Sequence, residues 1–140
     1  MNDKWKLLVV DDNTGIHEVT RIVLSDFVFE GRCLQIINAY SAKDGMKMLD
    51  VHPDIAVALI DVAMESENAG LELLGYIRKE KELESIQIIV RTEKSFHEIA
   101  TSCCKDVAFT YYYVQKSSLS PARLRHVVSK ALQRFKEDIH

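Results

Sequence analysis

Apolar residues follow two patterns that alternate along this chain. Short unbroken apolar runs, such as residues 56–60 (AVALI), are typical of strands covered on both faces of a sheet. Between these runs, apolar residues recur three or four positions apart, which places them on one face of a helix. The runs predict five strands, at residues 6–10, 34–40, 55–61, 86–91 and 109–114. The spaced segments predict five helices, within residues 13–27, 41–51, 70–77, 96–103 and 120–135.

Polar residues mark the starts of several of these helices. Asn13 or Asp12 can cap the first helix and Ser41 the second, because a short acceptor side chain satisfies free backbone N–H groups. Ser120 followed by Pro121 is a typical start for the last helix. Strands that alternate with helices form a parallel sheet with helices on both faces and right-handed crossovers. We therefore expect an α/β fold, a doubly wound five-stranded parallel sheet in the order 2-1-3-4-5.

Carboxylates follow two of the predicted strands at the point where each strand ends. Asp11 and Asp12 come directly after the first strand, and Asp61 ends the third. In this strand order the two strands are neighbours at the switch point of the sheet, where ligands bind. Three crowded carboxylates repel one another unless a cation is present, and Mg²⁺ prefers such hard oxygen ligands. The sequence therefore predicts a magnesium site, at which an aspartate can attack phosphorus and form an aspartyl phosphate.

A hydroxyl and an ammonium group are predicted at the same edge of the sheet. Thr92 follows the fourth strand, and Lys116 lies just beyond the fifth. Both groups can bind the oxygens of a phosphoryl group carried by Asp61. Taken alone, Thr92 could be a plain turn residue and Lys116 a solvated surface lysine. Asp61 taken alone could be a helix cap.

Composition excludes several classes of function. The chain has 140 residues, the usual size of one domain, and a formal net charge of −3. Without a basic excess we expect no direct nucleic-acid binding and no binding to an anionic membrane. We also expect no signal peptide and no membrane span, because no apolar run reaches the necessary length.

The cysteines and histidines show no ligand or disulfide spacing. Cys33, Cys103 and Cys104 are an odd number, which favours reduced thiols and a cytoplasmic location. We interpret all five histidines as surface groups; they are His17, His52, His97, His126 and His140.

Five segments taken together resemble one family, the receiver domains of two-component response regulators. The resemblance runs from about residue 6 to residue 135, and its segments are residues 9–12 (VVDD), residues 59–64 (LIDVAM), residues 70–73 (GLEL), Thr92 and Lys116. It implies a flavodoxin-like receiver fold over residues 1–140 as a single domain. It also implies that Asp61 is the phosphoacceptor.

The resemblance assigns a role to each residue of the site. Asp12, Asp61 and the backbone carbonyl of Ala63 would ligate Mg²⁺, and Asp11 would act through a water molecule. Thr92 and Lys116 would bind the phosphoryl oxygens. Tyr113 takes the place of the switch aromatic that moves with Thr92, although burial or edge protection explains that tyrosine equally well.

The implied partners follow from the family. A sensor histidine kinase or a phosphotransfer protein would supply the phosphoryl group, and the chain would not be a turnover enzyme. Further segments, among them residues 52–57 (HPDIAV), are similar to receivers that precede HD-type metal-dependent phosphohydrolase modules. That output module is absent from this chain. The surface of the fourth helix, fifth strand and fifth helix could bind a partner or a second copy of the chain.

Three positions depart from the usual pattern of the family. Glu65 stands where proline is usual, Ser117 stands where a cis proline follows the lysine, and Glu93 stands where a small residue is common. They motivate an alternative, a degenerate receiver that binds proteins without phosphorylation. A phosphatase of the haloacid dehalogenase type is disfavoured by Ala63, which replaces its second aspartate. We interpret residues 65–67 (ESE) as a solvated connection.

Overall fold

The computed structural model describes residues 4–95, 97–99 and 112–139. The strands are β1 (Trp5–Val10), β2 (Val28–Phe29), β3 (Arg32–Ala39), β4 (Ile55–Ile60), β5 (Gln87–Thr92) and β6 (Tyr112–Gln115). The helices are α1 (Thr14–Val23), α2 (Ala42–Val51), α3 (Ala69–Gly75) and α5 (Pro121–Asp138), with a π-helical turn η1 (Tyr76–Glu80) and a 3-10 turn η2 (Lys116–Ser118). The predicted fourth helix and the first part of the predicted fifth strand lie mostly outside the described residues.

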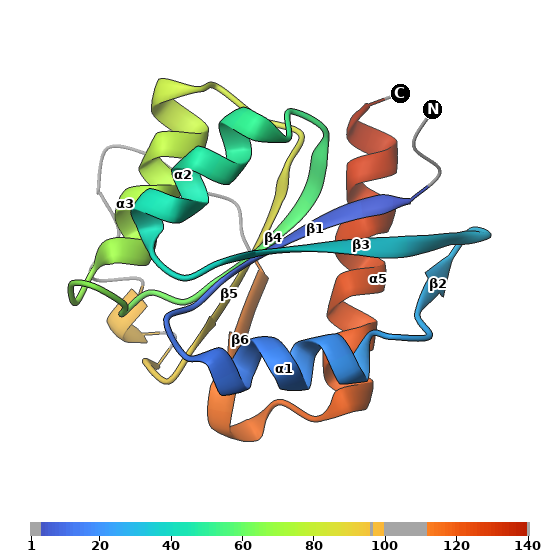
Figure 1. Ribbon diagram of the computed structural model, residues 1–140, viewed down its shortest axis with the longest axis horizontal. Coiled ribbons are helices and arrows are strands. Elements are labelled where there is room, and N and C mark those ends of the chain that lie inside the picture. Colours follow the sequence, from blue (N-terminus) through green and yellow to red (C-terminus); the bar gives the residue numbers. More distant parts are fainter. Residues whose placement is uncertain (1–3, 96, 100–111, 140) are drawn as a thin grey trace.

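The sheet has the predicted parallel order. Its strands run β2-β3-β1-β4-β5-β6, and the last five are parallel to one another. These five are the predicted order 2-1-3-4-5, with β1 and β4 side by side in the middle (Figure 1). The flavodoxin-like α/β prediction is therefore confirmed.

One edge strand was not predicted. β2 pairs antiparallel with the start of β3, with Val28 opposite Cys33. The turn between them uses Glu30 and Gly31, whose φ angles are 49° and 76°. A strand of two residues is too short to show an alternating pattern, so nothing in the hydrophobic pattern predicts it.

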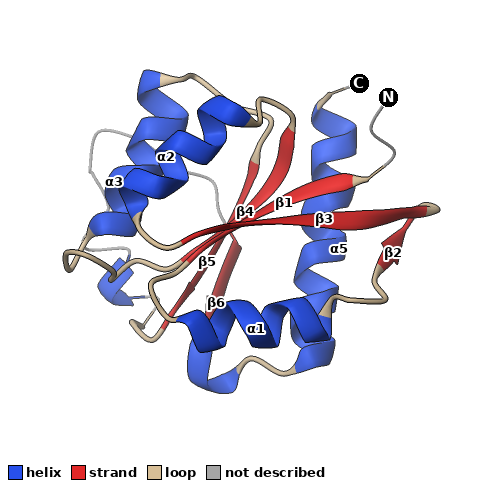
Figure 2. Ribbon diagram, in the orientation of Figure 1, coloured by secondary structure: helices blue, strands red, loops and turns tan. Residues whose placement is uncertain are grey.

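The helices form one layer on each face of the sheet (Figure 2). α2 and α3 pack on one face, and α1 and α5 pack on the other. β1 divides its side chains between the two cores, because successive residues of a strand point to opposite faces: Leu8 and Val10 join one core, and Leu7 and Val9 the other. All six residues of β4 are buried, as the unbroken apolar run predicts.

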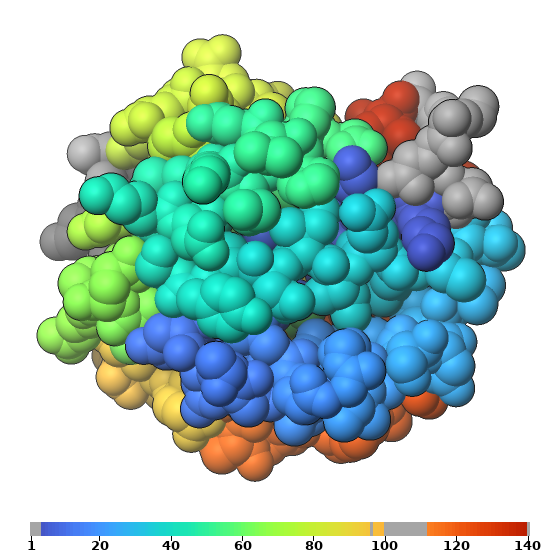
Figure 3. Space-filling model, in the orientation of Figure 1, coloured from blue at the N-terminus to red at the C-terminus, as the bar shows by residue number. Residues whose placement is uncertain are grey.

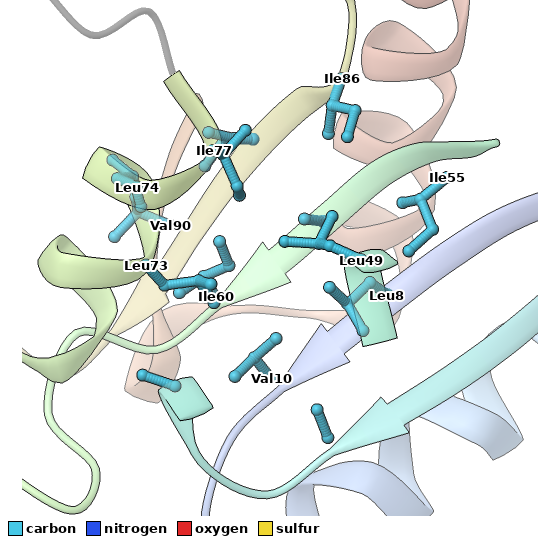
Figure 4. Packing of buried hydrophobic residues seen from close by; sticks show 14 of the residues in the cluster. Leu8, Val10, Leu49, Ile55, Ile60, Leu73, Leu74, Ile77, Ile86 and Val90 are labelled. Atoms are coloured by element: carbon cyan, nitrogen blue, oxygen red, sulfur yellow. The ribbon is translucent and has the colours of Figure 1, made fainter. Parts of the chain in front are cut away.

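The larger core lies under α2 and α3. Leu49 of α2 and Leu73 and Leu74 of α3 are at most 4% exposed and pack against Val10 and Ile60 of the central strands (Figure 4). In the space-filling view, the segments from α1 to α2 close over the sheet (Figure 3). Among the described residues, no helix combines the length and apolar character needed to cross a membrane.

Candidate functional site

Three carboxylates meet where β1 and β4 end. Asp11, Asp12 and Asp61 each offer an oxygen, and these oxygens all lie within 4.8 Å of one another. Asp11 and Asp61 are buried, at 1% and 6% exposure, while Asp12 is exposed. The sheet ladder continues past the strand ends, because the Asp11 N–H donates to Ala39 O (3.1 Å) and the Asp61 N–H to Val10 O (3.0 Å). The carboxylates therefore stand on a fixed backbone.

Lys116 joins two of these acids. It begins η2, directly after β6, and its Nζ lies 2.8 Å from Asp11 Oδ2 and 2.8 Å from Asp61 Oδ2. Burial by itself lowers the pKa of the Lys116 ammonium, but hydrogen bonds and charge from Asp11 and Asp61 outweigh burial, so its pKa is raised. The predicted meeting of acids and lysine is present, although Ser117 rather than proline follows. The described residues contain no cis peptide bond.

The acidic cluster suits a hard divalent cation. Asp11 Oδ1 accepts a hydrogen bond from the Asn13 N–H at 2.9 Å, whereas among the described residues the buried Oδ2 has only Lys116 as a partner. A buried carboxylate oxygen of this kind can accept a metal-bound water. Ala63, the predicted carbonyl ligand, is exposed in the loop after β4. The residues present therefore fit Mg²⁺.

Thr92 and Tyr113 are linked through one residue. Thr92 ends β5, is 1% exposed, and its Oγ1 accepts from the Lys94 N–H at 3.4 Å. The Tyr113 hydroxyl on β6 donates to the carbonyl of the same Lys94 at 2.5 Å. Burial, assisted by the nearby charges of Glu98 and Glu93, raises the pKa of this tyrosine. Thr92 and Tyr113 thus both hold the loop after β5.

Gly70 lets α3 start against the backbone of Asp61. Its N–H donates to Val62 O at 2.8 Å. A Cβ at this position would lie 2.0 Å from Asp61 O and 2.7 Å from Val62 Cα, which are impossible contacts with backbone atoms. Glycine is therefore required beside the candidate phosphoacceptor.

Comparison with known proteins agrees with this geometry. Residues 7–129 match the sequence model of the response regulator receiver domain. The chain belongs to the response regulator receiver domain family. Its acids, Thr92 and Lys116 stand at the strand ends of this receiver.

Three relatives show how far the similarity extends. The 3'3'-cGAMP-specific phosphodiesterase 2 of Vibrio cholerae is 32% identical over 135 residues, which are 96% of this receiver but only 26% of that protein. The signal receiver domain of an HD domain-containing protein from Pseudomonas fluorescens has a TM-score of 0.77 at 16% identity, covering 99% of this chain and 93% of that one. A receiver domain protein from Clostridium thermocellum has a TM-score of 0.72 at 22% identity, covering 94% and 97%. The expected similarity to receivers of HD-type proteins is thus found.

Glu65 has a contact that the sequence did not suggest. This receiver carries it in the loop after β4, and its carboxylate accepts hydrogen bonds from the Ala42 N–H at 2.9 and 3.0 Å and from the Lys43 N–H at 3.4 Å. Burial acts to raise the pKa of Glu65, but these backbone donors outweigh it and the pKa is lowered. Residues 65–67 are exposed, as expected of a solvated connection, but Glu65 also binds the start of α2, which the sequence did not predict.

His17 does not have the predicted exposure. It is 5% exposed, whereas we predicted a surface group. Its Nε2 donates to Asp11 O at 2.7 Å, its Nδ1 lies 2.7 Å from Asn38 Oδ1, and its ring packs against Tyr40 at a centroid distance of 4.4 Å. His17 stands in the first turn of α1, and the only sequence signal was its position close after the two aspartates. The histidine holds the backbone between Asp11 and Asp12.

Proposed function

We propose that this receiver accepts a phosphoryl group on Asp61 from the phosphohistidine of a sensor histidine kinase or a phosphotransfer protein. The observation that carries the proposal is the position of Lys116 Nζ, 2.8 Å from both Asp61 Oδ2 and Asp11 Oδ2, in a cluster of three carboxylates. An aspartate that only capped a helix would need neither the lysine nor the two further carboxylates beside it. Such a kinase partner implies a cytoplasmic location.

Asp12, Asp61 and the backbone carbonyl of Ala63 would hold Mg²⁺, with Asp11 acting through water. The ion supplies positive charge for the oxygens of the transferring group. A carboxylate oxygen of Asp61 forms the new P–O bond while the P–N bond of the phosphohistidine breaks, and the electron pair returns to the imidazole. Lys116 neutralises charge on the phosphoryl oxygens, so the chain contributes positioning and electrostatics.

The phosphoryl group would act as a switch. It adds a charge of about −1.5 to −2 at pH 7. Thr92 is released from the Lys94 N–H to donate to a phosphoryl oxygen, and Tyr113 follows it. The loop held at Lys94 by both residues then shifts between two pre-existing arrangements.

The readout surface would consist of β6, α5 and the predicted fourth helix. We propose that it recruits a partner, an HD-type phosphohydrolase module outside this chain, or a second copy. Residues 1–140 would act as one receiver domain that turns over no substrate of its own. The phosphodiesterase activity named for the Vibrio relative is that protein's.

Beryllofluoride, which mimics a phosphoryl group on a carboxylate, tests the proposal. Fluorine NMR should show a bound resonance that requires Mg²⁺ and disappears in Asp61→Asn. The matched control is Asp54→Asn, because Asp54 lies before β4 at the opposite end of the same strand. Phosphorylation by a small-molecule phosphodonor, followed by mass spectrometry, should show the same dependence. If wild type binds no beryllofluoride and takes up no phosphoryl group, the degenerate-receiver alternative replaces the proposal.

A further inference from the structure

Arg91 is a buried cation that the proposed phosphorylation chemistry does not use. It lies on β5 next to Thr92, but on the opposite face of the sheet, towards α1, and it is only 5% exposed. Its Nη1 donates to Thr20 Oγ1 at 2.8 Å. Of the five N–H donors of a guanidinium, this is the only one with a hydrogen-bond partner in the described part of the chain. A buried charge with so few partners is costly unless something else satisfies it.

The acids of the phosphoacceptor site do not fill this need. Among the described residues, no carboxylate lies within ion-pair distance of Arg91. Burial lowers the pKa of the guanidinium, and the more distant charges of Asp11 and Asp61 offset only part of that effect. Arg91 therefore keeps N–H donors that no described residue accepts, its charge is only partly balanced, and its free nitrogens are not fully enclosed by protein.

A pocket opens beside this guanidinium. Its lining residues come mainly from α1 and from the segment that joins β6 to α5, two parts of the chain that run along the lower edge of Figure 1. The cavity measures about 100 Å³, and its polar lining includes Arg91, Thr20 and Lys116. The apolar part of its wall is formed by Ile16, Val19, Val23, Leu119 and Leu124.

The lining carries cations and apolar groups but, among the described residues, no carboxylate. One edge of a guanidinium matches the two oxygens of a carboxylate bidentately. The aliphatic wall can then cover an alkyl chain. Inorganic phosphate fits less well, because the aliphatic side chains that form most of the lining offer no donors to its further oxygens.

We propose that this pocket binds a small aliphatic monocarboxylate, with its carboxylate on Arg91 and its alkyl chain against α1 and α5. An apolar cavity of ~150 Å³ accommodates benzene, so this one encloses about four non-hydrogen atoms. Propionate and butyrate have five and six, so the carboxylate and the first carbons would lie inside and the end of the alkyl chain would extend along exposed Val19 at the mouth of the pocket. The walls come from α1, β5, the segment after β6, and α5, so they surround a small molecule rather than offer a flat surface to a macromolecule.

Calorimetric titration of the full chain with butyrate tests the proposal, without Mg²⁺ or a phosphodonor. We expect saturable binding that weakens at least about tenfold in Arg91→Met, a change of about 1.4 kcal/mol. Arg134→Met is the matched control, because Arg134 is an exposed arginine of α5 that pairs with Asp138 at 3.1 Å and does not line the pocket. It should bind butyrate as wild type does.

Two further measurements test the same proposal if Arg91→Met folds poorly. Val19→Phe changes a residue that lines the pocket yet is 57% exposed, so the variant should fold and should still lose butyrate binding by filling the space. Butyramide has the size of butyrate without its charge and should not bind. Absence of butyrate binding in wild type, equal binding in Arg91→Met, or equal binding of inorganic phosphate would each overturn the proposal. These results do not depend on whether Asp61 is phosphorylated.

Discussion

The carboxylate of Glu65 accepts two hydrogen bonds from the backbone N–H of Ala42, at 2.9 and 3.0 Å. Ala42 begins α2, and Glu65 stands in the loop that follows the phosphoacceptor strand β4. Ser41 caps the same helix through the Asp44 N–H at 3.0 Å. The free donors at the start of α2 are thus divided between a local cap and a carboxylate from a distant loop. This contact ties the loop beside Asp61 to α2.

Glu65→Ala should destabilise the chain by about 0.5–2 kcal/mol, the usual cost of losing a helix cap. Urea unfolding followed by circular dichroism measures the change. Glu67→Ala is the control, since the Glu67 side chain is 82% exposed and, within the described part of the chain, pairs only with the ammonium of Lys94 at 3.4 Å. Equal stability of the two variants would contradict the capping role.

The Glu65 contribution should depend on pH. Because its pKa is lowered in the folded chain, the charged carboxylate stabilises the fold above its ordinary pKa of 4.5, and this stability is lost as pH falls through the folded-state value. The free energy of unfolding of wild type should exceed that of Glu65→Gln by about 0.3–1 kcal/mol near neutral pH. The difference should vanish in acid, as a pH series of urea titrations would measure. A constant difference would show that charge is not the cause.

Gly70→Ala should damage both stability and the site, because a Cβ there meets Asp61 O at 2.0 Å. We expect a loss of about 1–3 kcal/mol, as for other overpacked positions, together with weaker Mg²⁺ binding. Gly75→Ala is the matched control. Gly75 lies in α3 with nothing within 4 Å of a Cβ, so alanine there should stabilise the helix by about 0.5–1 kcal/mol. Thermal unfolding with and without Mg²⁺ measures both variants.

Lys116→Met should make the chain more dependent on Mg²⁺. Without the ammonium, Asp11 and Asp61 are buried like charges, so the metal-free variant should lose about 1–3 kcal/mol. Mg²⁺ should then restore more stability than it adds to wild type, since the lysine no longer competes for the acids. Melting temperatures across a Mg²⁺ series test this.

Lys94→Met is the control for the lysine experiment. Its side chain is 17% exposed and ion-paired with Glu67 at 3.4 Å, close to the site but not with the three acids. It should keep the Mg²⁺ response of wild type. If Lys116→Met also keeps the Mg²⁺ response of wild type, the ion pairs of Lys116 with Asp11 and Asp61 do not affect Mg²⁺ binding.

Trp5 should not report on the site. It begins β1, whereas Asp11 follows the end of that strand, so about 20 Å of strand separates them. Its Nε1 donates to Phe29 O at 2.9 Å, and Arg32 lies 3.7 Å above its ring. Its emission should therefore stay unchanged on Mg²⁺ binding and should shift in Arg32→Ala. A large Mg²⁺-dependent change would show that the two ends of β1 are coupled.

Much of the architecture follows from local patterns. The unbroken run over β4 predicted a central strand because a strand buried on both faces cannot alternate polar and apolar residues. The carboxylates after β1 and β4 predicted one acidic site, because parallel neighbours end at the same edge. The cap at Asn13 was predicted as one of two choices, and its side chain does accept from the Gly15 and Ile16 N–H groups.

What the sequence pattern missed depends on contacts between distant segments. Glu65 and Ala42 are 23 residues apart, and Arg91 and Thr20 are 71 apart. No spacing rule connects such pairs. The sequence therefore predicted neither the contact of Glu65 with α2 nor the contact of Arg91 with α1. His17 is buried because Asp11 after β1, and Asn38 and Tyr40 at the end of β3, surround it.

The sequence by itself determined the order of strands and helices, the parallel sheet and the edge at which the acids, Thr92 and Lys116 gather. These features depend on hydrophobic periodicity and on where each strand ends, and both are local properties of the chain. Only the tertiary structure decided which donors each charged side chain meets. Glu65 caps a helix, and Arg91 faces a pocket with most of its donors unused, because packing of the two helical layers fixes partners that periodicity does not encode.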